Sequence, residues 1–325
     1  MKAIVISEYG GSDKLVVTEL PKPQAAEGEI LIKVKAFGIN RAETYMRRGL
    51  FGDVAKVSGI ECVGQVEHDP SGKIKQGQTV AAIMGGMGRT INGSYAEYTV
   101  VPAANVMVVH TNMDWADLAA LPESYATAWT ALHDNLKMKE GCRMLIRGGT
   151  SALGQAAINI AANTAEVEII ATTRSADNVA MLKELGAKHV LLEGDALSAQ
   201  VRALYPDGVD GVLDIVGNTT LLDSVKAVKK GGYVCNAGFL GGGAPFPFNP
   251  LMDLPSSVYL SLFASFNFGH KDFPLSAIPM QRFVDYATDR MYQAQPKRVF
   301  QFNEIAAAHD AMESDQVRGK IVVVV

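Results

Sequence analysis

A glycine-rich turn between an apolar strand and a helix of small residues constrains the fold of this chain more than any other feature. The run CRMLIR leads into GGTSALG and then into QAAINIAA, together residues 142–162. Gly149, Ser151 and Gly154 occupy the three positions of a G-x-G-x-x-G fingerprint, with serine at the middle one. Such a turn presents the free N–H groups of a helix N-terminus to the phosphates of a dinucleotide. The motif alone leaves open a tight corner that binds no ligand.

Strand-like and helix-like segments alternate around this turn. From about Asp117 onward, apolar residues recur at helical spacing between short apolar runs. The expected strands are 144–147, 167–173, 189–192, 211–216 and 233–236, and the expected helices are 152–163, 178–185 and 219–228. This alternation predicts an α/β fold with a doubly wound parallel sheet. A further apolar strand is expected within SVYLSLFASF.

The first third of the chain has the sequence pattern of β-strands rather than of alternating strands and helices. ILIKVKAFGI, GQTVAAIM and SYAEYTVV are apolar or alternating runs between turns that carry glycine and proline. They predict a compact β-rich domain, to which the closing KIVVVV could return. A length of 325 residues gives room for two such domains.

Composition excludes several function classes. Thirty basic and 34 acidic residues give a formal charge of −4, which offers no broad field for nucleic acid. No run of about 18 apolar residues occurs, and Glu8 interrupts the N-terminal segment, so we expect a cytoplasmic protein without a membrane span or leader. Cys62, Cys142 and Cys235 are too few and too far apart for a disulfide framework, and we expect them to be buried.

The end of the expected second strand indicates which dinucleotide would bind. Enzymes that use NAD usually place an acidic residue there to bind the ribose hydroxyls. Here the sequence IIATTRS puts Thr173, Arg174 and Ser175 at that point. The planar guanidinium of Arg174 suits a 2′-phosphate, which predicts NADPH. The alternative is an arginine on a solvated loop.

The chain resembles the medium-chain dehydrogenase/reductase superfamily, specifically its zinc-free quinone oxidoreductase, or zeta-crystallin-like, branch. The resemblance rests on FGINRAETYMRRG, SGIECVG, NGSYAEYTVVP, ESYATAWTAL, GGTSALG, DIVG and GKIVV, which occur in the family's order over nearly the whole length. It implies a GroES-like catalytic domain at 1–122 and a Rossmann dinucleotide-binding domain at 123–262, with a cleft between them. Residues 263–325 would complete the catalytic domain.

The resemblance also implies cofactor contacts from loops at the carboxyl ends of the strands. The full set of cofactor-binding candidates is Thr127, Gly149, Ser151, Ala152, Leu153, Gly154, Thr173, Arg174, Ser175, Gly217, Asn218, Ala237, Gly238, Phe239 and Lys320. Turn chemistry alone could explain several of them, and Lys320 could equally be a solvated lysine. Glu193 stands where these reductases often carry a tyrosine beside the adenosine phosphate, which weakens the preference for NADPH.

The zinc ligands of the related alcohol dehydrogenases are missing, so no metal is expected. The cysteine position in FGINRAE is Asn40 or its neighbour, and the histidine position in SGIECVG is Ile60. The four-cysteine lobe is also absent, and Glu61 is interpreted as structural. Three histidines that each precede an aspartate are expected at the surface: His68, His133 and His309.

Without a Lewis acid, reduction of a simple ketone is difficult because it creates alkoxide character. Quinones and α,β-unsaturated carbonyls accept hydride more easily, since the product is a delocalised phenolate or enolate. We therefore expect NADPH-dependent reduction of one of these two classes. The resemblance implies Asn40 and Tyr45 as catalytic groups, although Tyr45 could be a core residue. Phe51 stands where enoyl-thioester reductases of this superfamily carry a tyrosine, which argues against that activity.

Two further interpretations remain open. The chain could be a zeta-crystallin-like NADPH-binding protein with a structural, regulatory or RNA-binding role, or a metal-free alcohol or ketone reductase. The apolar segment 258–266 is expected at a sheet edge, and the family commonly dimerises there, so a homodimer is expected. A small-molecule quinone or enone is the expected partner.

Overall fold

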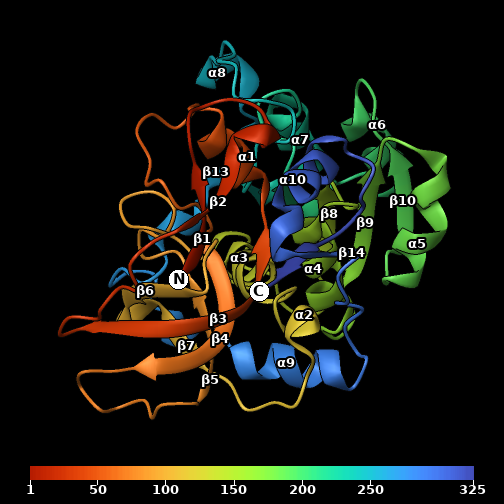
Figure 1. Cartoon of the computed structure of the whole chain (residues 1–325). Coiled ribbons are helices and arrows are strands. Elements are labelled where there is room, and N and C mark those ends of the chain that lie inside the picture. Colours follow the sequence, from red (N-terminus) through yellow and green to blue (C-terminus); the bar gives the residue numbers. More distant parts are fainter. The chain divides into compact units, whose positions relative to one another are not determined.

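The computed structural model describes residues 1–325, which divide into two compact units. The first unit comprises Met1–Glu123, Ser265–Arg290 and Ala294–Val325, and the second comprises Ser124–Ala264 with Met291–Gln293. Each unit has its own sheet (Figure 1). No helix is both long and apolar enough to span a membrane.

The first unit is β-rich, as the sequence predicts. Its strands are β1 (Lys2–Ile6), β2 (Leu15–Glu19), β3 (Glu29–Ile39), β4 (Glu61–His68), β5 (Thr79–Ile83), β6 (Tyr98–Pro102), β7 (Val106–Val108), β14 (Arg298–Gln301) and β15 (Ile321–Val324). A seven-stranded sheet has the order β14-β15-β3-β4-β5-β7, with β6 also paired to β3, while β1 and β2 form a separate hairpin. The closing strand β15 lies antiparallel to β3, so the C-terminal segment joins this sheet. The helices of the unit are α1 (Arg41–Arg47), α2 (Trp115–Leu118), α9 (Met280–Thr288) and α10 (Ile305–Glu313).

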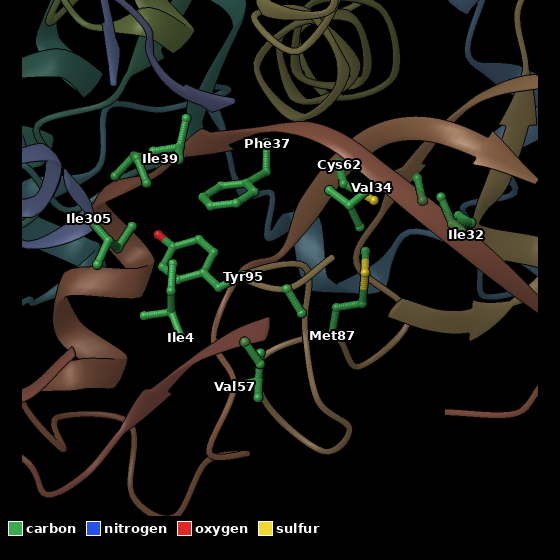
Figure 2. Close-up of a cluster of buried hydrophobic side chains, with 14 of the residues drawn as sticks. Ile4, Ile32, Val34, Phe37, Ile39, Val57, Cys62, Met87, Tyr95 and Ile305 are labelled. Atoms are coloured by element: carbon green, nitrogen blue, oxygen red, sulfur yellow. The ribbon is translucent and has the colours of Figure 1, made fainter. Parts of the chain in front are cut away.

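Apolar residues of β3 fill the core of this unit. Ile32, Val34, Phe37 and Ile39 are fully buried, and Figure 2 shows them together with the ring of Tyr95. The rings of Phe37 and Tyr95 stack with centroids 4.5 Å apart. Burial of these side chains on one packed face stabilises the sheet at roughly 25 cal/mol per Å² of apolar surface.

The second unit is the doubly wound parallel sheet that the alternating sequence predicts. Its strands are β8 (Arg143–Arg147), β9 (Glu168–Thr173), β10 (His189–Leu192), β11 (Val209–Asp214), β12 (Val228–Asn236) and β13 (Tyr259–Leu262). All of them are parallel, in the order β10-β9-β8-β11-β12-β13. The order reverses between β8 and β11, which is the switch point where sheets of this kind bind ligands outside the carboxyl ends of the strands. The helices are α3, which begins in the first unit (Pro122–Thr130), α4 (Ala152–Ala162), α5 (Val179–Glu184), α6 (Leu197–Leu204), α7 (Leu221–Ala227) and α8 (Pro250–Asp253).

Several elements of the second unit differ from expectation. β12 begins at Val228 rather than at residue 233, and β11 begins at Val209 rather than at residue 211. β11 ends at Asp214, two residues early, because the Asp214 carboxylate accepts hydrogen bonds from the N–H groups of Val216 and Gly217 and turns the chain out of the sheet. Helix α6 was not expected, since it is short and its first residue follows Ala196, which has a left-handed backbone. The expected strand after Pro255 is β13, and it lies at the sheet edge.

Candidate functional site

The glycine-rich corner connects β8 to α4. The hydroxyl of Ser151 accepts a hydrogen bond from the Gly154 N–H at 3.0 Å and donates one to the Gly148 carbonyl at 2.8 Å, so it caps the helix. The first N–H groups of an α-helix have no partner within the helix, and here they belong to Ala152 and Leu153. The corner therefore offers two adjacent N–H donors at the positive end of an eleven-residue helix.

Gly154 allows this close approach of helix and turn. A Cβ atom at this position would lie 2.8 Å from the Gly149 Cα and would collide with the Gly148 carbonyl. Thr172 at the end of β9 holds the turn from its other side: its hydroxyl accepts from the Gly148 N–H and its carbonyl accepts from the Gly149 N–H, both at 3.1 Å. Packing thus requires a glycine at position 154, which is the role of the third glycine in a dinucleotide-binding fingerprint.

Beyond β9 the chain presents the residues expected near the adenosine ribose. Thr173 is buried, and its hydroxyl accepts from the Ser175 N–H and the Asn178 side chain. Ser175 caps the following turn and bonds Asp177, while Arg174 is exposed. The roles of Thr173, Arg174 and Ser175 in cofactor binding stay predictions.

The loops after β11 and β12 are tied to each other. The side-chain amide of Asn236 donates to the carbonyls of Asp214 at 3.1 Å and Gly238 at 2.9 Å. Gly217 has a φ of 87°, which glycine tolerates best, and a Cβ there would lie 2.6 Å from the Gly238 carbonyl. The candidates Gly217, Asn218, Ala237, Gly238 and Phe239 therefore lie on two interlocked loops at the carboxyl edge of the sheet. Phe239 is 45% exposed there. The remaining candidate of this unit, Thr127, is buried within α3.

A buried ionic network that the sequence analysis missed lies beside the glycine corner. Arg147, the last residue of β8, is 2% exposed and forms ion pairs with Glu193 after β10 and Asp223 in α7. Asp223 in turn accepts hydrogen bonds from Ser198 at the start of α6. The sequence did contain a signal for this network. Strands of a parallel sheet that is covered on both faces are usually apolar throughout, so a charged residue such as Arg147 in one of them indicates a buried ionic partner.

In the first unit the candidates Asn40 and Lys320 meet at a buried carboxylate. Glu61 Oε1 accepts from Lys320 Nζ at 2.5 Å and from Asn40 Nδ2 at 2.9 Å. Asn40 Oδ1 accepts from Lys320 Nζ at 2.7 Å. Lys320 is only 5% exposed, so the alternative of a solvated lysine is wrong. The amide of Asn40 is held in one orientation by a cation on one side and a carboxylate on the other.

Glu43 adds a second carboxyl group to this cluster. It lies in the first turn of α1, is fully buried, and accepts hydrogen bonds from the N–H groups of Asn40 at 2.6 Å and Ile60 at 3.2 Å. Burial, together with the charge of Glu61, raises the pKa of Glu43 to about 8. The sequence offered one signal, Asn40 followed three residues later by Glu43, which is the spacing of a capping interaction at a helix start.

The side chains of this cluster do not fit a catalytic zinc ion. Zinc sites in proteins take thiolate, imidazole and carboxylate ligands. Here the corresponding positions hold the carboxamide of Asn40, the hydrocarbon of Ile60 and the carboxylate of Glu61, whose oxygens already accept from Lys320, Asn40 and the Glu123 N–H. The Lys320 ammonium would also repel a second cation. No group of three or more His, Cys, Asp or Glu side chains is arranged to hold a metal ion.

Tyr45 is half-buried on α1, and its ring meets that of Phe51 edge to face with centroids 5.9 Å apart. Phe51 is itself 44% exposed. Tyr45 is thus neither a fully buried core residue nor a fully solvated one, and its catalytic role stays a prediction.

The expectation that His309 is a surface residue was wrong. Its side chain is fully buried in α10, where Nε2 lies 3.0 Å from the Tyr95 hydroxyl and Nδ1 lies 3.3 Å from Arg47 Nη1. A guanidinium can only donate, so Nδ1 accepts and the neutral ring carries its proton on Nε2. Burial and the charge of Arg47 lower the pKa of His309 to about 3. His68 is exposed and His133 is half-buried, while the three cysteines are buried as expected.

A parallel sheet with a glycine corner, combined with a separate β-rich unit, is the architecture of two-domain dehydrogenases and reductases. Two family models match the chain. The model described as "Alcohol dehydrogenase GroES-like domain" matches residues 26–111, and the model described as "Zinc-binding dehydrogenase" matches residues 152–280.

Known relatives agree with these models along the full length. A quinone oxidoreductase from Lama guanicoe is 24% identical over 99% of this chain and 97% of its own length. The chloroplastic NADPH-dependent alkenal/one oxidoreductase of Arabidopsis thaliana is 28% identical over 99% of this chain and 79% of its own. A mycobacterial protein solved in complex with NADPH superimposes with a TM-score of 0.87 at 26% identity and full coverage of both chains. The chain belongs to the medium-chain dehydrogenase/reductase superfamily, in its quinone oxidoreductase branch.

Proposed function

We propose that this protein is a zinc-independent oxidoreductase that uses NADPH to reduce a quinone or an α,β-unsaturated carbonyl. The observation that carries the proposal is the corner between β8 and α4, where Gly154 and the Ser151 cap leave the N–H groups of Ala152 and Leu153 available for a pyrophosphate. The names of the Lama guanicoe and Arabidopsis relatives support the two acceptor classes, and the mycobacterial complex supports NADPH.

The choice of NADPH rests on the charges at the end of β9. The exposed guanidinium of Arg174 suits a 2′-phosphate, and Thr173 and Ser175 beside it carry no charge. The nearby carboxylate of Glu193 is already bonded to Arg147. These features favour a phosphate over the bare ribose hydroxyls.

The acceptor classes follow from what the first unit can supply. Bound NADPH would supply a hydride to a carbon of the acceptor. A carbonyl oxygen then gains the displaced electron pair and needs a proton or a hydrogen bond. Tyr45 offers a phenolic donor on α1, and Asn40, the second catalytic candidate, is held in one orientation by Glu61 and Lys320. One neutral donor is adequate for a delocalised phenolate or enolate and is weak support for an alkoxide.

The test is the loss of NADPH absorbance in the near ultraviolet when chelator-treated protein meets an ortho-quinone, a simple enone or a simple ketone, with NADH in parallel. Turnover of the first two acceptors with NADPH is expected. Turnover of the ketone alone would favour a metal-free alcohol or ketone reductase. Binding of NADPH without turnover of any acceptor would refute the enzymatic proposal and favour a non-catalytic binding protein.

A matched pair of variants tells whether the glycine corner carries the binding. G154A introduces a Cβ that meets backbone atoms, while G243A adds one in an exposed loop where nothing lies within 4 Å. NADPH affinity should fall for the first variant and stay unchanged for the second.

We also propose a homodimer formed through β13. This strand is at the sheet edge, and it exposes Tyr259 by 58% and Leu262 by 60%. An unpaired edge of this kind is a template for pairing with a second copy. Sedimentation of wild type and L262K would test it, since a charge on the edge should shift a dimer toward the monomer.

A further inference from the structure

We propose that Arg147 and Glu193 together set the choice between NADPH and NADH, with the guanidinium masking a carboxylate that would otherwise repel the 2′-phosphate. This inference rests on the proposed function, because it concerns the adenosine end of the same cofactor. Arg147 acts here as a positioning residue through Glu193.

The two side chains form a planar fork. Arg147 Nε lies 3.2 Å from Glu193 Oε1, and Nη2 lies 2.6 Å from Oε2. The third nitrogen, Nη1, faces away and donates to Asp223 at 2.9 Å, to Ser224 Oγ at 3.1 Å and to the Thr220 carbonyl at 3.2 Å. Every nitrogen of the guanidinium is therefore bonded to protein, so Arg147 is not itself arranged as a phosphate ligand.

Glu193 lies beside the point where the second strand of the sheet ends. Its N–H donates to the Thr173 carbonyl at 2.8 Å, and its Oε1 accepts from the Thr172 hydroxyl at 2.5 Å. In sheets of this order the residues that end the second strand recognise the ribose hydroxyl or its phosphate. A carboxylate on this edge is thus a near neighbour of whatever Thr173 and Arg174 receive.

The charge of Glu193 explains why a partner is needed. A carboxylate near a phosphate dianion is repulsive, and the repulsion grows where water is partly excluded. Glu193 is only 15% exposed, so water screens it poorly, and the bidentate arginine, which also pairs with Asp223, supplies the opposing charge instead. Asp177, which bonds Ser175, is exposed and better screened.

A purely structural role for Arg147 would give a different result. Arg147 also ties α7 to the sheet through Asp223 and Ser224. If that were its whole contribution, its loss would weaken NADPH and NADH alike, because NADH differs only by lacking the 2′-phosphate. The discriminating quantity is the ratio of the two dissociation constants.

The experiment measures dissociation constants of NADPH and NADH by fluorescence titration at low ionic strength for wild type, R147M, E193Q and the double variant. R147M should weaken NADPH relative to NADH by about tenfold, the order expected for one partly screened charge. E193Q should leave the ratio of the NADPH dissociation constant to the NADH dissociation constant unchanged or lower it. In the double variant, this ratio should return to the value measured for E193Q. Equal weakening of both cofactors by R147M, or no recovery in the double variant, would overturn the inference.

E193D provides a test that does not disturb the strand. The shorter side chain keeps the charge but cannot reach the arginine fork and Thr172 together, so it should weaken NADPH relative to E193Q. An unchanged ratio in E193D overturns the inference even if R147M does not fold. Failure of wild type to bind either nucleotide would instead overturn the proposed function.

Discussion

We expect Glu43, the fully buried carboxyl group on α1, to make the free energy of unfolding vary with pH. Burial and the nearby charge of Glu61 raise the pKa of Glu43 to about 8, against the opposing effects of Lys320 and two backbone N–H groups. The folded protein therefore keeps this proton over a range in which the unfolded chain has lost it. Stability from this source is fully present below the unfolded pKa of 4.5 and is lost as pH rises to about 8.

His309 acts in the opposite direction. Burial and Arg47 lower the pKa of His309 from 6.5 to about 3, so the unfolded chain binds this proton more readily. Stability from the neutral ring is present above pH 6.5 and is lost as pH falls toward 3. Each group changes the free energy of unfolding by about 1.4 kcal/mol per pH unit within its own window. The two effects on the free energy of unfolding cancel between about pH 4.5 and 6.5, where both groups titrate. Between pH 6.5 and about 8, only Glu43 changes the stability.

E43Q isolates the contribution of Glu43. Glutamine has nearly the same shape, and its carbonyl can accept from the Asn40 N–H, but it carries no titratable proton. The difference in unfolding free energy between variant and wild type should move in favour of E43Q by about 1.4 kcal/mol per pH unit, on the order of 4 kcal/mol from pH 5 to 8. Any cost of fitting the amide is independent of pH and does not alter this slope.

Urea unfolding at four pH values between 5 and 8 measures the difference. E140Q, at an exposed glutamate, is the control and should parallel wild type. A constant difference between E43Q and wild type across this range would show that Glu43 ionises alike in the folded and unfolded chains. The reasoning from burial would then be refuted.

Three further outcomes are expected. G154A should lower the free energy of unfolding by about 1–3 kcal/mol, since the new methyl group meets backbone, whereas G243A should have no measurable effect. K320M should lower the free energy of unfolding, measured by thermal unfolding, by about 3–5 kcal/mol, because it leaves the buried Glu61 carboxylate without its cation. The double variant K320M/E61Q should recover part of that loss. Y45F should lower kcat for quinone or enone reduction by about a hundredfold if the phenol gives the proton, with little change in the melting temperature.

Much of the fold could be predicted because its signals are local. The alternation of apolar runs with helical spacing gave the parallel sheet, and β8 and α4 lie within a residue or two of their expected ends. Gly154 could be assigned for the same reason, since the spacing from strand to helix fixes which residue must have no side chain. β11 ended early because the bonds of one aspartate overrode the apolar run beyond it.

The charged networks could not be predicted, because their members are remote in sequence. Lys320 and Glu61 are separated by 259 positions, and no local pattern indicates their pairing. His309 was misplaced for the same reason: an aspartate next in sequence says nothing about Arg47 and Tyr95, which bury the ring from other elements. Arg147 ends an apolar strand, and the sequence alone gives no sign that its ion-pair partners are Glu193 and Asp223.

Both units bury a cation among carboxylates beside residues proposed to bind cofactor or acceptor. Lys320 lies against Glu61 with Asn40, and Arg147 lies against Glu193 next to Thr172. Apolar residues of similar volume often stabilise a fold at least as well as a buried ion pair, since they have no desolvation penalty. Departures from ordinary core packing are expected at functional sites. Stability alone is therefore a poor explanation for two such pairs in one chain, and a role in orienting Asn40 and in masking Glu193 accounts for both.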